Sequence, residues 1–122
     1  MENGKILYVD DEDVNLFIFE VNLGKKFNVI TASSGKQGLE VLDSNPGIAV
    51  VVTDMRMPLM DGLEFVRVAR ERFTNLKFYM LSAFDINEEI QKAIKEGLIR
   101  RYFQKPLNLQ EIESELVKVL AW

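Results

Sequence analysis

Acidic, hydroxyl and ammonium side chains follow the apolar runs of this sequence. In chain order they are Asp10 and Asp11, Asp54, Ser82 and Lys105. Carboxylates that lie together repel one another and raise each other's pKa unless a cation lies among them, and all-oxygen ligands suit Mg²⁺. An ammonium and a hydroxyl are donors expected around phosphoryl oxygens. If the fold brings these groups together, they predict Mg²⁺-dependent phosphoryl transfer with Asp54 as the nucleophile that forms an acyl phosphate.

Each of these residues also has a simpler interpretation when it is taken alone. An acidic pair ahead of a helix can cap the helix and complement its dipole. Asp54 can form the turn that continues to Pro58. Ser82 can be an ordinary loop hydroxyl, and Lys105 a solvated side chain. The phosphoryl-transfer interpretation therefore depends on whether separate strand ends meet in space.

Five apolar runs, each typical of a short strand, could position these residues. They cover residues 5–9, 27–32, 48–52, 77–81 and 99–104. The β-branched run at 48–52, which ends near Asp54, is typical of a strand buried on both faces of a parallel sheet.

A helical pattern follows each run. The first has apolar residues at Val14, Phe17, Ile18 and Val21 and predicts an amphipathic helix. Asp85-Ile86-Asn87 marks the start of the fourth helix, Gly97 ends it, and Asn108 can cap the fifth. Repeated strand–helix units with right-handed crossovers predict a doubly wound α/β domain, where ligands bind at the carboxyl ends of the strands.

The composition excludes several classes of function. The 122 residues, 48% hydrophobic and 28% charged, suit one domain over residues 1–122. No run is long enough to span a membrane and no signal peptide is visible, so we expect a cytoplasmic protein. The absence of cysteine and histidine excludes disulfides, thiolate catalysis, Ser-His triads, histidine-ligated zinc and a phosphohistidine formed on this chain. The net charge of −4 argues against direct nucleic-acid binding.

The sequence resembles the receiver domains of bacterial two-component response regulators. The likeness extends from Lys5 to about Leu120 and rests on ILYVDDE at 6–12, VVTDMRMPLMDG at 51–62, MLSA at 80–83 and QKP at 104–106. It implies one flavodoxin-like (βα)5 domain with five parallel strands in the order 2-1-3-4-5. It also implies that Asp54 accepts the phosphoryl group.

The same resemblance implies a metal site. Asp11, Asp54 and the backbone carbonyl of Arg56 would bind Mg²⁺, for which Mn²⁺ can substitute. Asp10 would orient a metal-bound water.

The resemblance further implies a switch. Ser82 and Lys105 would contact the phosphoryl group, and the ring of Tyr102 would turn inward as Ser82 moves toward it. Arg56 and Phe84 lie at positions that flank the path of the hydrolytic water in this family. We expect the bulky Phe84 to restrict that water and to lengthen the lifetime of the phosphoryl group.

One spacing departs from the common pattern of the family. Gly97 lies eight residues before Lys105, where many receivers have seven. A similar lengthened form is found in receivers fused to hybrid kinases or cyclic-dinucleotide phosphodiesterases. The output surface of the fourth helix, fifth strand and fifth helix is therefore expected to differ in detail. Arg100 and Arg101 either make that surface basic or are solvated residues of an edge strand.

By this resemblance the chain is a phosphoacceptor switch that assists its own phosphorylation and dephosphorylation, and not an enzyme acting on a metabolite. A sensor histidine kinase or phosphotransfer protein would supply the phosphohistidine. A downstream protein, or a fused output domain, would read the switch, with no direct contact to nucleic acid or membrane. No output module follows the fifth helix, so we expect a stand-alone regulator or an excised receiver.

Two alternatives remain open from the sequence. One is a receiver-like scaffold that binds partners without being phosphorylated. The other is a phosphatase of the haloacid-dehalogenase type, whose Asp-x-Asp-x-Thr/Val motif is matched only in part, because Asn15 stands at the last position.

Overall fold

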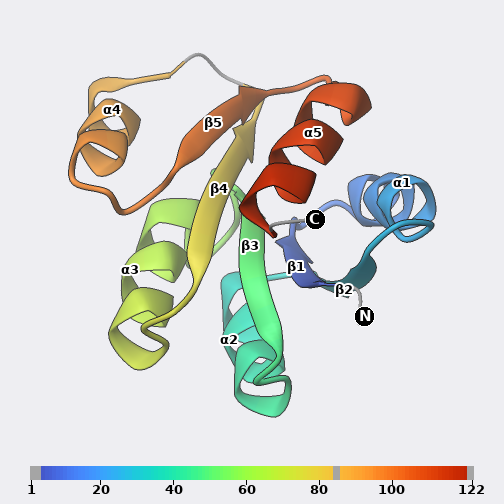
Figure 1. The fold of residues 1–122 in the computed structure, drawn as a ribbon. Helices are drawn as coiled ribbons and strands as arrows, with labels where there is room; N and C mark the ends of the chain where they lie inside the picture. Colours follow the sequence, from blue (N-terminus) through green and yellow to red (C-terminus); the bar gives the residue numbers. More distant parts are fainter. Residues whose placement is uncertain (1–3, 84–85, 121–122) are drawn as a thin grey trace.

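A computed structural model describes residues 4–83 and 86–120 as alternating strands and helices (Figure 1). The strands are β1 (Lys5–Val9), β2 (Asn28–Ala32), β3 (Ile48–Asp54), β4 (Lys77–Ser82) and β5 (Arg101–Gln104). The helices are α1 (Asp13–Leu23), α2 (Gly35–Ser44), α3 (Gly62–Arg72), α4 (Glu88–Lys95) and α5 (Leu109–Val119). The strands form one parallel sheet in the order β2-β1-β3-β4-β5, which confirms the predicted fold class and strand order.

Helices cover both faces of this sheet, as Figure 1 shows. Helices α2, α3 and α4 pack on one face and α1 and α5 on the other, each layer enclosing its own apolar cluster. Side chains of β3 alternate between the two layers, with Val51 in one cluster and Val50 and Val52 in the other. The β-branched run is therefore buried on both faces, and the strand that carries Asp54 is held from both sides.

Local capping sets most helix starts where the sequence indicates them. The side chains of Ser34 and Asn108 accept hydrogen bonds from Gln37 N and Glu111 N at the starts of α2 and α5. The fourth helix begins at Glu88, later than the predicted start, because the side chain of Asn87 caps it: Ile90 N donates to Asn87 Oδ1 at 2.8 Å. Asp85 lies outside the described residues.

The end of the fourth helix and the start of the fifth strand also differ slightly from expectation. Helix α4 ends at Lys95, and Gly97 has a φ of 79°, a left-handed conformation that glycine adopts without a steric penalty. The strand begins at Arg101 and not at the predicted Ile99, which is buried in the connection.

The apolar stripe predicted for α1 does not face the sheet. Val14 and Phe17 are each 67% exposed, and Ile18 and Val21 are 45% exposed. The sheet is contacted instead by a second stripe of the same helix, with Phe19 and Leu23 buried. Apolar residues lie on most of the circumference of α1, so helical spacing identifies the helix but does not choose the face that packs.

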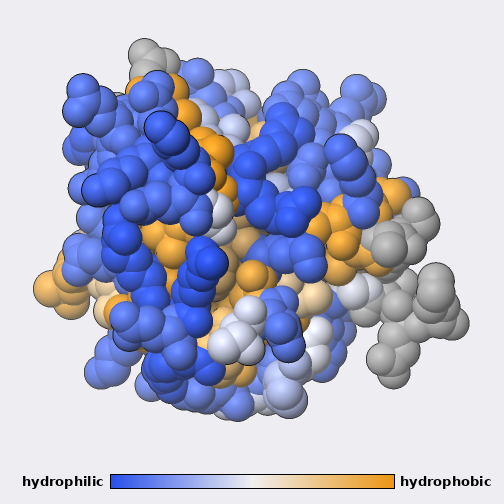
Figure 2. All heavy atoms as spheres, turned by 60° about the vertical axis from the view of Figure 1, so that its left-hand side comes forward, coloured by the Kyte–Doolittle hydropathy of each residue, from blue (hydrophilic) through white to orange (hydrophobic). Residues whose placement is uncertain are grey.

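Figure 2 views the side that carries α3 and α4, where hydrophilic residues predominate and apolar residues show between them. Within residues 4–83 and 86–120, no helix has the length and apolar character required to cross a membrane.

Candidate functional site

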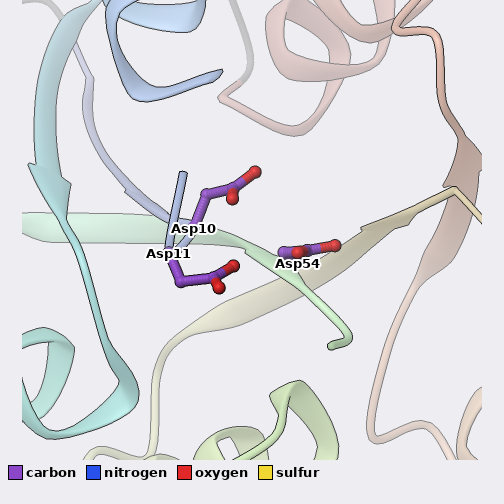
Figure 3. A group of neighbouring side chains, drawn as sticks. All are labelled: Asp10, Asp11 and Asp54. Atoms are coloured by element: carbon purple, nitrogen blue, oxygen red, sulfur yellow. The ribbon is translucent and has the colours of Figure 1, made fainter. Parts of the chain in front are cut away.

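Three carboxylates lie together at the carboxyl ends of the central strands (Figure 3). Asp10 and Asp11 follow β1, and Asp54 is the last residue of β3, its neighbour in the sheet. Each offers one oxygen, and these oxygens lie within 4.8 Å of one another. Asp10 and Asp54 are buried, whereas Asp11 is exposed. The parallel sheet therefore brings together the acidic residues that the sequence places more than forty positions apart.

The backbone after β3 fixes the carboxylate of Asp54. Met55 N donates to Asp54 Oδ1 at 3.0 Å, and Gly62 N donates to the carbonyl of Met55 at 2.8 Å, which closes the loop back onto the strand. Burial raises the pKa of Asp54 to about 6; Lys105 opposes this rise, and the charge of Asp10 adds to it. A bound cation would relieve the cost of ionising this carboxyl.

Lys105 reaches into the site from the end of β5. Its Nζ lies 3.0 Å from Asp10 Oδ2 and 3.4 Å from Asp54 Oδ1, and its backbone N donates to the carbonyl of Ser82 at 2.7 Å. Burial alone would lower the pKa of Lys105, but the hydrogen bond and charge of Asp10 and the charge of Asp54 raise it overall. Lys105 is thus a protonated donor shared between two carboxylates. The peptide bond that it makes with Pro106 is cis.

The fully buried Asp10 is held by three donors. Glu12 N donates to Oδ1 at 3.0 Å, while Tyr8 Oη, at 2.6 Å, and Lys105 Nζ both donate to Oδ2. The sequence interpretation did not identify Tyr8 as a site residue. The sequence does place Tyr8 two residues before Asp10 in an extended segment, so the two side chains are expected on the same face, and this spacing could have identified Tyr8.

The residues assigned to switching lie near the same end of the sheet. Ser82 is 1% exposed and is the last residue of β4, paired in register with Gln104. Tyr102, on β5, is half-buried and packs against the cluster beneath α2, α3 and α4. The side chain of Arg56 is exposed in the loop after β3. Phe84 lies outside the described residues.

That loop also borders a surface pocket of about 500 Å³. Its lining comes from the loop after β3 and from the start of α4, including Arg56, Pro58 and Asn87. Leu59, at the tip of the loop, is fully exposed and has a φ of 70°.

One of the two arginines discussed for the output surface, Arg101 on β5, is paired with acidic residues. Arg101 donates to Glu111 at 3.0 Å and to Glu115 at 3.1 Å, both on α5, and its guanidinium lies 4.7 Å from the ring centroid of Phe103. Tyr79 Oη donates to Glu115 at 2.8 Å, so this glutamate joins β4, β5 and α5. Burial would raise the pKa of Glu115, but the donors Tyr79 and Arg101 lower it overall. Arg101 therefore mainly links β5 to α5.

The donor set fits a hard divalent cation. Three carboxylates offer the oxygen ligands that Mg²⁺ prefers. Asp11 is exposed, so the cluster is open to water, and Mg²⁺ usually keeps several water molecules as ligands. Both oxygens of Asp10 already accept hydrogen bonds, which leaves Asp11 and Asp54 better placed as direct ligands. A doubly wound α/β domain with such an acidic cluster and an adjoining lysine is a protein suited to metal-assisted chemistry on an anionic group.

Comparison with known proteins identifies the family to which this domain is similar. The family model for the response regulator receiver domain matches residues 6–117. The chemotaxis protein CheY1 of Helicobacter pylori is 32% identical over 121 residues, which are 96% of this chain and 97% of that protein. A receiver domain protein from Clostridium thermocellum is 30% identical in its crystal structure, with a TM-score of 0.87 over 94% of this chain and 92% of that one.

The chain also matches part of a longer protein. The hydrogenase transcriptional regulatory protein HoxA of Cupriavidus necator is 32% identical over 101 residues, which are 83% of this chain but only 21% of HoxA. Together these matches show that the chain belongs to the response regulator receiver domain family. Members of this family are the signalling switches of two-component phosphorelays, and that is the signalling in which this domain acts.

Proposed function

We propose that Asp54 is the phosphoacceptor of a single receiver domain formed by residues 1–122. This proposal rests on the position of the Asp54 carboxylate. Lys105 Nζ lies 3.4 Å from Asp54 Oδ1, and the carboxylates of Asp10 and Asp11 lie beside it. A phosphoryl group on Asp54 would therefore enter a site that already holds a cationic donor. Ser82, at the end of the neighbouring strand, is the second donor that we assign to the phosphoryl oxygens.

Phosphoryl transfer to Asp54 exchanges a P–N bond of the donor for a P–O bond of the carboxylate. A carboxylate oxygen of Asp54 attacks the phosphorus of a phosphohistidine, the new P–O bond forms, and the P–N bond breaks. The imidazole leaves and takes up a proton from solvent. Lys105 neutralises charge on the phosphoryl oxygens during the transfer, and the domain thereby assists its own phosphorylation.

Asp11, Asp54 and the backbone carbonyl of Arg56 are the groups that we assign to Mg²⁺ or Mn²⁺, with Asp10 holding a water at the metal. A divalent cation bound there would offset the charge of the carboxylates and of the phosphoryl oxygens. Without it, the mutual repulsion of Asp10 and Asp54 opposes the approach of a phosphodonor.

A group outside these 122 residues has to supply the phosphohistidine, because they contain no histidine. We assign the docking of this donor, a sensor histidine kinase or phosphotransfer protein, to the exposed stripe of Val14, Phe17, Ile18 and Val21 on α1. A pocket of about 290 Å³ joins this helix to the site, since Ile18 and Lys105 both line it. Apolar side chains left exposed beside a reactive site are typical of a protein interface.

Phosphorylation is then read through the output surface of α4, β5 and α5. We assign the switch to Ser82 and Tyr102, and the control of the hydrolytic water to Arg56 and Phe84. The reader is a downstream protein or a fused output domain. The cytoplasmic location expected from the sequence is part of this proposal.

Incubation with acetyl phosphate and Mg²⁺ tests the proposal directly. Intact-mass measurement should show one added phosphoryl group that is lost in base, and none in Asp54→Asn. Asp61→Asn is the matched control, because Asp61 caps α3 outside the cluster through Glu64 N and asparagine caps equally well. A wild-type chain that gains no mass, or an Asp54→Asn variant that gains as much as wild type, would refute the assignment and favour the scaffold alternative.

The docking assignment has its own test. Phe17→Ser should slow transfer from a histidine kinase that phosphorylates the wild-type chain, while the reaction with acetyl phosphate stays unchanged. Loss of both reactions would instead indicate damage to the site.

A further inference from the structure

Tyr8 links the acidic cluster to the core of the domain. Its side chain is 1% exposed on β1, and its ring stacks on Phe19 of α1 with centroids 4.0 Å apart and planes inclined by 9°. Its hydroxyl is 2.6 Å from Asp10 Oδ2, a short hydrogen bond to a carboxylate. The ring is therefore fixed by packing, and the hydroxyl is aimed at one oxygen of the site.

That oxygen is the one that Lys105 also uses. Asp10 Oδ2 accepts from Tyr8 Oη and from Lys105 Nζ, the latter at 3.0 Å. The second oxygen of Asp10 accepts from Glu12 N. Because Asp10 is fully buried, bulk solvent does not reach Oδ2, and a donor that leaves it has to be replaced from within the site.

Lys105 has to leave Asp10 if it is to follow the phosphoryl group. Its Nζ is closer to Asp10 than to Asp54, at 3.0 Å against 3.4 Å, before any phosphoryl group is present. Moving it onto a phosphorylated Asp54 would remove one donor from a buried oxygen. A donor that remains on that oxygen keeps this movement from leaving an unpaired buried acceptor, and Tyr8 Oη is such a donor.

We propose that Tyr8 is a positioning residue that holds Asp10 Oδ2 and thereby releases Lys105 to the phosphoryl group on Asp54. This inference rests on the proposed function of Asp54. A purely structural role, in which the hydroxyl simply finds the nearest acceptor, is the competing explanation. The two differ in whether loss of the hydroxyl affects phosphorylation beyond its effect on stability.

Tyr8→Phe isolates the hydroxyl, because the ring and its stack on Phe19 are retained. Tyr79→Phe is a matched control. Tyr79 is also fully buried and its hydroxyl also donates to a carboxylate, but that carboxylate is Glu115 on α5, outside the cluster. Both variants therefore lose one buried hydroxyl bonded to a carboxylate, and only one of them loses it at the site.

The experiment measures phosphorylation by acetyl phosphate at saturating Mg²⁺, and the Kd for Mg²⁺ separately by calorimetry. Tyr8→Phe should lower the maximal rate about tenfold, with the Kd for Mg²⁺ changed less than about threefold, as expected for a lost hydrogen bond to a charged group. Tyr79→Phe should change both quantities less than about twofold. In a Lys105→Ala background, Tyr8→Phe should cause no further loss of rate, because the released residue is absent.

Several outcomes would overturn the inference. They are an unchanged rate in Tyr8→Phe, an equal loss in Tyr79→Phe, a loss of Mg²⁺ affinity in proportion to the rate, and a full additional loss in the Lys105→Ala background. Each is distinct from failure of the proposed function, in which the wild-type chain itself gains no phosphoryl group.

Discussion

Replacing Asp54 by asparagine is expected to stabilise the metal-free domain above about pH 6. Burial raises the pKa of the Asp54 carboxyl from 3.8 to about 6, with Lys105 opposing and Asp10 adding to the rise. Because the folded-state pKa lies above the ordinary value, the protonated carboxyl favours folding at low pH. This contribution is lost as the pH rises through the folded-state pKa, and an amide, which does not ionise, avoids the loss.

The magnitude follows from the difference between the two pKa values. It corresponds to about 3 kcal/mol of unfolding free energy at neutral pH. The side chain of Asp54 is only 8% exposed, so an asparagine amide there also has to be buried, and its own desolvation cost offsets part of this gain. We therefore expect a gain of about 1–2 kcal/mol for Asp54→Asn.

Urea unfolding in the presence of a chelator measures this gain. The unfolding free energy of Asp54→Asn should exceed that of wild type at about pH 7.5, and the two should converge toward about pH 4. Asp61→Asn should follow wild type throughout, because its amide preserves the cap. Adding Mg²⁺ at 100 times its Kd should raise the stability of the wild type by about 2.7 kcal/mol and reduce the gap. A difference that is independent of pH, or a variant less stable than wild type at pH 7.5, would refute the electrostatic reasoning.

Three further variants test the framework of the site. Leu59→Gly should raise the unfolding free energy by about 0.5 kcal/mol in urea, because Leu59 is fully exposed at a left-handed φ of 70° and glycine removes the steric cost there; an unchanged or lower value would contradict this. Gly62→Ala should lower the melting temperature, with a loss of about 2 kcal/mol, since the new Cβ would lie 2.4 Å from the backbone carbonyl of Asp54; a stability equal to wild type would show that the loop yields. Arg101→Ala should cost about 1 kcal/mol at low salt and less in 1 M NaCl, and a loss independent of salt would assign the effect to packing on Phe103.

The sequence was sufficient to predict the fold and to locate its acidic edge. The apolar run at 48–52 placed a buried strand directly before Asp54, and the parallel arrangement of such strands placed Asp10 and Asp11 at the same edge. These features depend on short-range patterns: a strand buried on both faces needs continuous apolar residues, and a helix start needs a capping side chain such as Asn108.

Residue spacing alone did not predict the structure correctly where two different arrangements fit the same sequence pattern. Asp85 and Asn87 are both capping residue types, and the structure places the cap of α4 at Asn87. Both apolar stripes of α1 have helical spacing, and the stripe that includes Phe17 stays exposed while Phe19 packs on Tyr8. Periodicity measures which residues share a face, but the shape of the sheet decides which face is buried.

Only the tertiary structure decided which charged and polar groups share a partner. Lys105 is 95 positions from Asp10 in the chain, yet the two side chains meet, and Tyr8 donates to the same oxygen. Arg101 was expected either to make the output surface basic or to be solvated, but α5 brings two glutamates to it. Hydrogen bonds and ion pairs act over a few ångströms, so they depend on the final packing of distant segments. The sequence determined which chemical groups reach the edge of the sheet, and the packing of strands and helices determined how those groups are paired there.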